Sequence, residues 1–200
     1  MEGTGIAGQN PFSGMSDPAL RSEASLAFEK AWNEASSARD FPLRRDIGLK
    51  SFARFAPMMA IIEPDMDKPS LPFRLAGSGF FDFFGTDLTG VDYLSLVDPA
   101  ISQDAYDCVR ALMARPCGLW QFTPVLDISG SRRDYEYTIF PIAKEAPENG
   151  DGAADHILIY VHSELTPADA MPDVQRLEGA TVWRWIDTGH GIPPVAAPFF

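Results

Sequence analysis

The sequence has little of what disulfide frameworks, metal sites and catalytic triads are made from. Only two cysteines occur, Cys108 and Cys117, and their number and spacing suit neither a disulfide framework nor a zinc ribbon. The histidines are His156, His162 and His190, and the first two would lie about 20 Å apart on one strand at roughly 3.3 Å per residue. We therefore expect surface or strand-edge histidines rather than a metal or Ser-His-Asp triad.

Positive charge and long apolar runs are also scarce. The chain has 16 Lys and Arg against 28 Asp and Glu, a formal net charge of -12. Its densest basic groups are the pairs Arg44-Arg45 and Arg132-Arg133, so nucleic-acid binding is disfavoured. No apolar run approaches the roughly 18 to 20 residues that span a bilayer, and no secretory pattern opens the chain. We predict a cytoplasmic protein without membrane insertion.

The chain does have enough apolar material for one ordinary domain. Its 200 residues are 46% hydrophobic and include 14 Phe and 4 Trp, which is typical of a globular protein. Residues 1–15 are rich in Gly, Ser, Asn and Pro, which predicts a mobile leader. Asp17 and Pro18 then predict the start of an amphipathic helix with apolar positions from Leu20 to Ala35. This helix packs on its own domain or pairs with a second copy.

The middle of the chain predicts short elements in alternation. They are a second helix between Asp46 and Pro57, strands over 58–63 and 71–76, a short helix over 80–84 and a longer helix over 101–114. Cys108 lies on the apolar stripe of the longer helix, where we expect a buried and inert thiol.

The last third predicts an antiparallel meander. Its strands are expected over 118–128, 134–143 and 157–163, with a hairpin turn at Ser129-Gly130-Ser131. Because the second and third strands are apolar on both faces, the outer sheet face should be covered. The cover would be the Leu20–Ala35 helix, the segment around Trp183 and Trp185, or another subunit. Residues 164–200 lose periodicity and predict an irregular C-terminal tail.

Two strands, helices and three further strands follow one another as in a PAS domain. Three motifs make this order more specific, namely Phe41-Pro42-Leu43-Arg44-Arg45-Asp46, Phe73-Arg74-Leu75-Ala76-Gly77-Ser78 and Gly85-Thr86-Asp87-Leu88-Thr89-Gly90. Together they resemble a bacterial PAS-like family formerly of unknown function, the fifth PAS group. The resemblance implies an α+β fold over 16–163, with a five-stranded antiparallel sheet and helices on one face. The N-terminal amphipathic helix would cover the other face.

The resemblance also implies a sensory or regulatory role. PAS domains mostly bind small molecules or partner proteins and convert occupancy into altered contacts. The cofactor is unknown, but a flavin photoadduct is disfavoured because the Asn-Cys-Arg-Phe motif is absent and the segment around Cys108 matches it poorly. Haem is disfavoured because the helix over 101–114 has no His, which leaves only Met113 as an axial ligand.

The predicted ligand pocket lies between the short helical segment and the sheet. The residues assigned to it are Arg74, Phe80, Phe81, Phe83, Phe84, Tyr93, Trp120, Phe122 and Tyr137. Of Tyr137 and Thr138, only one can face inward. Arg74 would contact an anionic ligand, face solvent or form a salt bridge. The nearby candidates for its partner are Asp82, Asp87 and Asp92. Plain packing of the aromatic rings, without a cavity, is the competing interpretation.

Two functional hypotheses of different class follow. The first is a non-catalytic PAS-like module that binds a small molecule or a protein partner. The alternative is a structural adaptor with a filled core and no ligand, which assembles through its sheet face and N-terminal helix as a homodimer or with another protein. We do not expect an enzyme, because the spacing shows no convergent acid-base pair.

Overall fold

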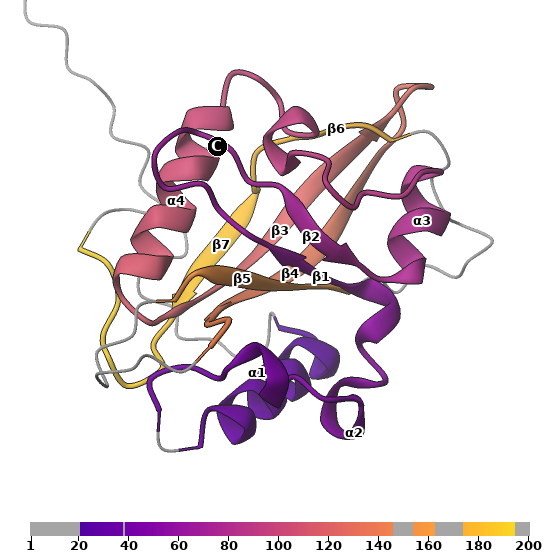
Figure 1. Ribbon diagram of the computed structural model, residues 1–200. Coiled ribbons are helices and arrows are strands. Elements are labelled where there is room, and N and C mark those ends of the chain that lie inside the picture. The colour runs from indigo at the N-terminus through magenta and orange to yellow at the C-terminus, as the bar shows by residue number, and fades with distance from the viewer. Residues whose placement is uncertain (1–20, 38, 146–153, 163–173, 195–200) are drawn as a thin grey trace, which may run out of the picture.

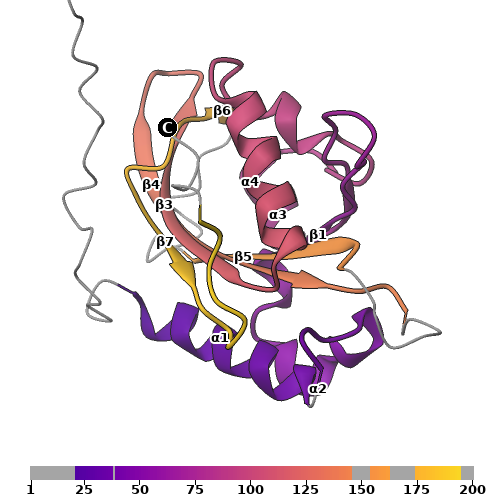
Figure 2. The ribbon, with the colours of Figure 1, turned by 90° about the vertical axis from the view of Figure 1, so that its left-hand side faces the viewer.

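An antiparallel sheet with helices on both faces forms the protein, as a computed structural model shows (Figure 1, Figure 2). The structure describes residues 21–37, 39–145, 154–162 and 174–194. The predicted leader, the helix start at Asp17 and part of the predicted tail lie outside these ranges. No helix in the described ranges is long and apolar enough to cross a bilayer.

The elements follow the expected order. The helices are α1 (Glu23–Ser36), α2 (Leu49–Phe52), α3 (Ser78–Phe84) and α4 (Ser102–Ala114), with 3-10 helices η2 (Arg44–Asp46), η3 (Ala56–Met58) and η4 (Tyr93–Ser95). The strands are β1 (Met59–Ile62), β2 (Phe73–Ala76), β3 (Gly118–Asp127), β4 (Arg132–Ile142), β5 (His156–His162), β6 (Val174–Leu177) and β7 (Val182–Ile186). The predicted second helix is instead divided among η2, α2 and η3. Gly48 lies between η2 and α2, and Pro57 lies within the short η3; both residues are poor helix formers.

The first five strands lie in the order β2-β1-β5-β4-β3, and all neighbouring pairs are antiparallel. β3 and β4 form a hairpin in which the Asp127 carboxylate accepts hydrogen bonds from the N–H groups of Ser129 and Ser131, each at 2.8 Å. Gly130 has a φ of 84° in this turn, a conformation that glycine adopts without strain. The predicted meander and its hairpin are confirmed.

The prediction of an irregular tail is wrong for β6 and β7. β6 pairs with the end of β3 and β7 pairs with its beginning, which makes a sheet of seven strands instead of the five expected. The two segments are only four and five residues long, so they carry too little alternation to predict a strand.

Pro124 explains why this edge of β3 is paired by two short strands rather than by one. The carbonyls of Phe122 and Pro124 accept hydrogen bonds from the N–H groups of Thr181 at 2.9 Å and Glu178 at 2.8 Å. Proline has no N–H to return a bond on that side. The ladder is therefore interrupted opposite Pro124, and residues between Leu177 and Val182 bulge out.

The outer face of the sheet is covered by α1 and α2, which confirms the first of the three predicted covers (Figure 2). α1 begins at Glu23, with the Ser22 side chain accepting a hydrogen bond from the N–H of Ser25. The Trp32 ring stacks on Phe140 with centroids 4.7 Å apart, and its Nε1 donates to the carbonyl of Pro141 at 3.0 Å. Trp185, by contrast, belongs to the inner core.

The inner face is covered by α3 and α4 (Figure 1, Figure 2). Phe80 and Phe83 of α3 are buried three positions apart, as one helix face requires. α3 ends at Gly85, whose φ of 69° suits a helix C-cap. Of the two candidates on β4, Tyr137 faces this inner core, whereas the Thr138 hydroxyl lies 2.7 Å from the Ser25 hydroxyl on the outer side.

Candidate functional site

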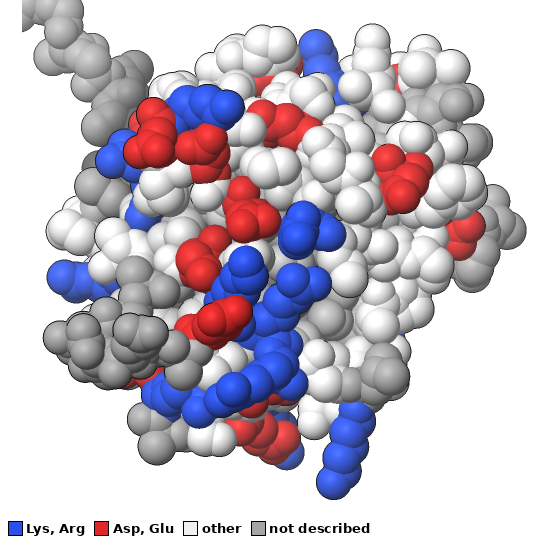
Figure 3. Space-filling view, viewed as in Figure 1, with Lys and Arg blue, Asp and Glu red and all other residues white. Residues whose placement is uncertain are grey.

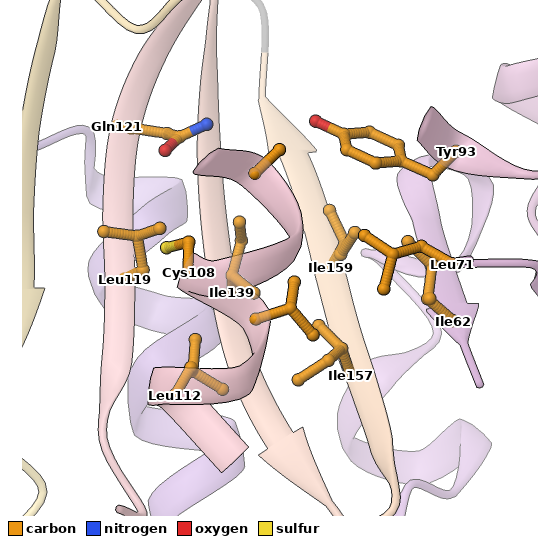
Figure 4. A pocket seen from close by; sticks show the side chains of 12 residues that line it. Ile62, Leu71, Tyr93, Cys108, Leu112, Leu119, Gln121, Ile139, Ile157 and Ile159 are labelled. Carbon is orange, nitrogen blue, oxygen red and sulfur yellow. The ribbon is translucent and has the colours of Figure 1, made fainter. Parts of the chain in front are cut away.

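A cavity of about 40 Å³ lies between α4 and the inner face of the sheet (Figure 4). Its lining is almost wholly apolar and consists of Ile62, Leu71, Tyr93, Ala105, Cys108, Val109, Leu112, Leu119, Gln121, Ile139, Ile157 and Ile159. The strand residues share one face because side chains alternate along each strand. On α4, spacings of three and four place the lining residues on one stripe.

Gln121 is the main polar group of this site. It is 5% exposed, and its Nε2 donates a hydrogen bond to the Thr123 hydroxyl at 2.8 Å. Its Oε1 has no hydrogen-bond partner among the described residues. A buried acceptor without a donor destabilises a fold by about 1–3 kcal/mol. Oε1 is therefore the group in this wall that most needs a partner.

Two ionisable groups, Tyr93 and Cys108, also face the cavity. Figure 4 shows the Tyr93 hydroxyl pointing toward Gln121 from the opposite side. Burial raises the pKa of the Tyr93 phenol, with a smaller contribution from Cys108. Burial likewise raises the pKa of the Cys108 thiol, and it raises the pKa of Cys117 to about 12. The prediction that Cys108 is buried is confirmed, and a thiol with so high a pKa is a poor nucleophile.

The structure brings only part of the predicted pocket together. Tyr93 lines the cavity. Phe80, Phe83 and Tyr137 are buried in the same inner core without lining it, and Phe84 packs against that core at its edge. Phe81 is 55% exposed and faces away, because it follows Phe80 by one position on α3.

Three residues of the predicted pocket lie elsewhere. Trp120 and Phe122 pack in the outer core beneath α1, whereas Tyr137 faces the inner core, so the prediction that all three line one pocket wall is wrong. Along β3 they alternate with Gln121, but alternation does not tell which face of the sheet is the inner one. Arg74 has a side chain 59% exposed, and its Nε lies 3.7 Å from Glu63 Oε2. It forms a surface ion pair with a partner that the sequence did not indicate, and it does not enter the cavity.

The prediction of a surface or strand-edge histidine is wrong for His156. This residue is 2% exposed, and its Nδ1 lies 2.6 Å from Asp155 Oδ1. It begins β5 next to β4, where Ile142 pairs with it, which explains its burial. Within the described part of the chain, no group of three or more His, Cys, Asp and Glu could hold a metal ion.

Sequence reasoning missed Gln121 and the aliphatic lining. One signal could have found Gln121, because it is a polar residue between two aromatic residues, Trp120 and Phe122, in a strand that is otherwise largely apolar. The aliphatic residues come from four strands, from α4 and from Leu71 in the segment before β2, so only the tertiary structure brings them together.

Comparison with known proteins identifies the fold. A family model described as PAS domain matches residues 20–150. One solved structure comes from a study in which a flavin analogue sheds light on the light-oxygen-voltage domain mechanism. It is 19% identical in sequence, the match covers 58% of this chain and 84% of that one, and the TM-score is 0.41. The structure of an RsLOV variant is 18% identical in sequence; the match covers 60% of this chain and 67% of that one, with a TM-score of 0.41. An RNA-binding light-oxygen-voltage receptor is 18% identical; the match covers 60% of this chain and 34% of that one, with a TM-score of 0.40. No curated protein matches the sequence.

Proposed function

The chain belongs to the PAS domain family, and from that premise we propose a non-catalytic sensory module that binds a very small neutral ligand beneath α4. The unpaired Oε1 of Gln121 carries this proposal. A ligand that donates a hydrogen bond to this oxygen would remove the penalty of a buried unsatisfied acceptor. The apolar remainder of the wall favours a ligand without charge.

The volume of the cavity limits the size of the ligand. A water molecule needs about 10–15 Å³ of such space, so the cavity of about 40 Å³ holds roughly three non-hydrogen atoms. A flavin or haem ring does not fit this space. Formamide and methanol have the required size and each carries a hydrogen-bond donor, so they are suitable probes.

β4 offers a route from the cavity to the outer face. Ile139 lines the cavity, and the adjacent Thr138 and Phe140 contact α1 on the other side of the sheet. A ligand that shifts β3 or β4 would therefore alter the packing of α1 against the sheet. The alternative, an adaptor with a filled core, is favoured by the small size of the cavity and predicts no response to any probe.

Thermal unfolding of the full chain with formamide or methanol tests the proposal. A ligand at ten times its Kd adds about 1.4 kcal/mol, which should raise Tm by roughly 3–5 °C. Gln121→Leu should abolish this shift. The control Gln103→Leu, an exposed glutamine on α4, should keep it. Native mass spectrometry of the purified protein should reveal any ligand retained from the cell. An equal shift in both variants, or no shift in any protein, would reject the proposed site.

A further inference from the structure

A groove of about 450 Å³ lies between α1 and α2 on the opposite side of the sheet from the cavity. Its floor includes the small side chains of Ala27 and Ala31, which leave the space open. Lys30, Lys50 and Arg54 line it, and Glu34 is the only acid among the described residues of its lining. Its volume lies in the range of about 300–1,000 Å³ that is usual for specific binding sites.

The chain segment that supplies all of this lining except Ala27 has a net charge opposite in sign to that of the whole protein. Residues 30–54 contain six basic and three acidic residues, a net charge of +3. The rest of the chain has ten basic and 25 acidic residues, a net charge of -15. Figure 3 shows Lys and Arg side chains gathered on the lower part of the face, where Figure 1 places α1 and the chain leading to α2.

Two of the cations in the groove are available to a ligand. Lys30 lies 3.9 Å from Glu34 on α1, but neither Lys50 nor Arg54 forms an ion pair with any residue that the structure describes. The Arg54 guanidinium stacks 4.5 Å above the centre of the Phe55 ring. Stacking orients the plane of the guanidinium and leaves its N–H edges free to bind a carboxylate with two hydrogen bonds.

We propose that this groove binds a short acidic segment of a partner protein. Exposed ion pairs contribute little binding free energy on their own, so a lone small anion would bind weakly. A peptide would also bury the apolar surface of Ala27 and Ala31 and would therefore bind more tightly. A long polyanion such as nucleic acid would extend beyond the groove onto the acidic remainder of the surface. A short segment meets only the basic region. Because α1 and α2 both line the groove, the bound segment would hold these helices together.

Selection from a library of random short peptides, followed by fluorescence anisotropy with one selected peptide, tests this proposal. The full-length protein should select peptides enriched in Asp and Glu. The double variant Lys50→Glu/Arg54→Glu should bind the selected peptide at least about tenfold more weakly. Higher salt should weaken binding to the unaltered protein. As a matched control, Lys68→Glu/Arg110→Glu reverses two exposed charges outside the groove and should leave Kd unchanged.

Three results would overturn the proposal. One is selection of peptides without acidic enrichment, or of none. Another is equal weakening in the control variant, which would indicate a general charge effect. The third is tighter binding of anionic vesicles than of the selected peptide, with the same dependence on Lys50 and Arg54. Circular dichroism of both variants verifies their folding. The proposal does not depend on the ligand cavity, since Gln121→Leu should leave peptide binding intact.

Discussion

At Gly77, where β2 turns into α3, the chain packs closely against the backbone of η3. A Cβ at this position would lie 2.0 Å from the carbonyl oxygen of Ala56 and 2.4 Å from that of Pro57. These atoms belong to the backbone and cannot move aside as a flexible side chain would. The glycine in the motif Phe73–Ser78 is therefore required by packing against η3.

Substitution of Gly77 tests this close approach. Gly77→Ala should lower the free energy of unfolding by about 2–3 kcal/mol, because the methyl group forces η3 and α3 apart. Gly48→Ala is the matched control, since a Cβ at Gly48 would have no other atom within 4 Å. That change should be neutral or stabilise by about 0.4–1 kcal/mol. Urea unfolding measures both values, and equal values would contradict the packing argument.

At the scale of elements, α1 is joined to β4 along most of its length. The N–H of Ser22 donates to Glu136 Oε1 at 3.0 Å, and ten residues later Trp32 bonds the carbonyl of Pro141. Ten helical residues span about 15 Å and five strand residues about 16.5 Å, so the two elements run side by side. Glu136 also accepts a hydrogen bond from Trp120 Nε1 at 2.5 Å. One buried carboxylate thus holds the beginning of α1 to the sheet.

Substitutions of Glu136 test this attachment. Glu136→Leu should cost about 2–4 kcal/mol of stability, because it leaves two donors without an acceptor in a site that is 2% exposed. Glu136→Gln keeps an acceptor oxygen and should cost about 1 kcal/mol. Asp134→Asn, an exposed change on the same strand, serves as the control. Equal urea midpoints for the Leu and Gln variants would show that the carboxylate does not hold α1.

At the scale of the whole molecule, two cores lie on opposite faces of one sheet. The inner core contains phenols and thiols that burial keeps neutral, among them Tyr93, Tyr137, Cys108 and Cys117. Burial raises the pKa of each of these groups above its ordinary value, and neighbouring phenols and thiols add to the effect. The native protein therefore retains protons at high pH that the unfolded chain releases.

Stability should consequently fall in alkaline solution. Well below the ordinary thiol pKa, at about pH 7, these groups are protonated in both states and make no contribution to pH dependence. Above the ordinary values of 9.0 for Cys and 10.0 for Tyr, only the unfolded chain loses protons, so the free energy of unfolding decreases as pH rises. The urea midpoint should be lower at about pH 10.5 than at about pH 8. Tyr137→Phe should reduce the difference, and equal midpoints would contradict the assignment.

The sequence by itself determined the type and order of most elements and the need for cover on both faces of the sheet. Periodicity, caps and turns are local, and apolar residues on both faces of β4 and β5 exclude a bare sheet. Only the tertiary structure decided which element covers which face. Alternation relates Trp120 to Gln121 but does not tell which one faces α4. Pairing of β6 and β7 with β3, and the burial of His156, depend on contacts between segments far apart in the chain.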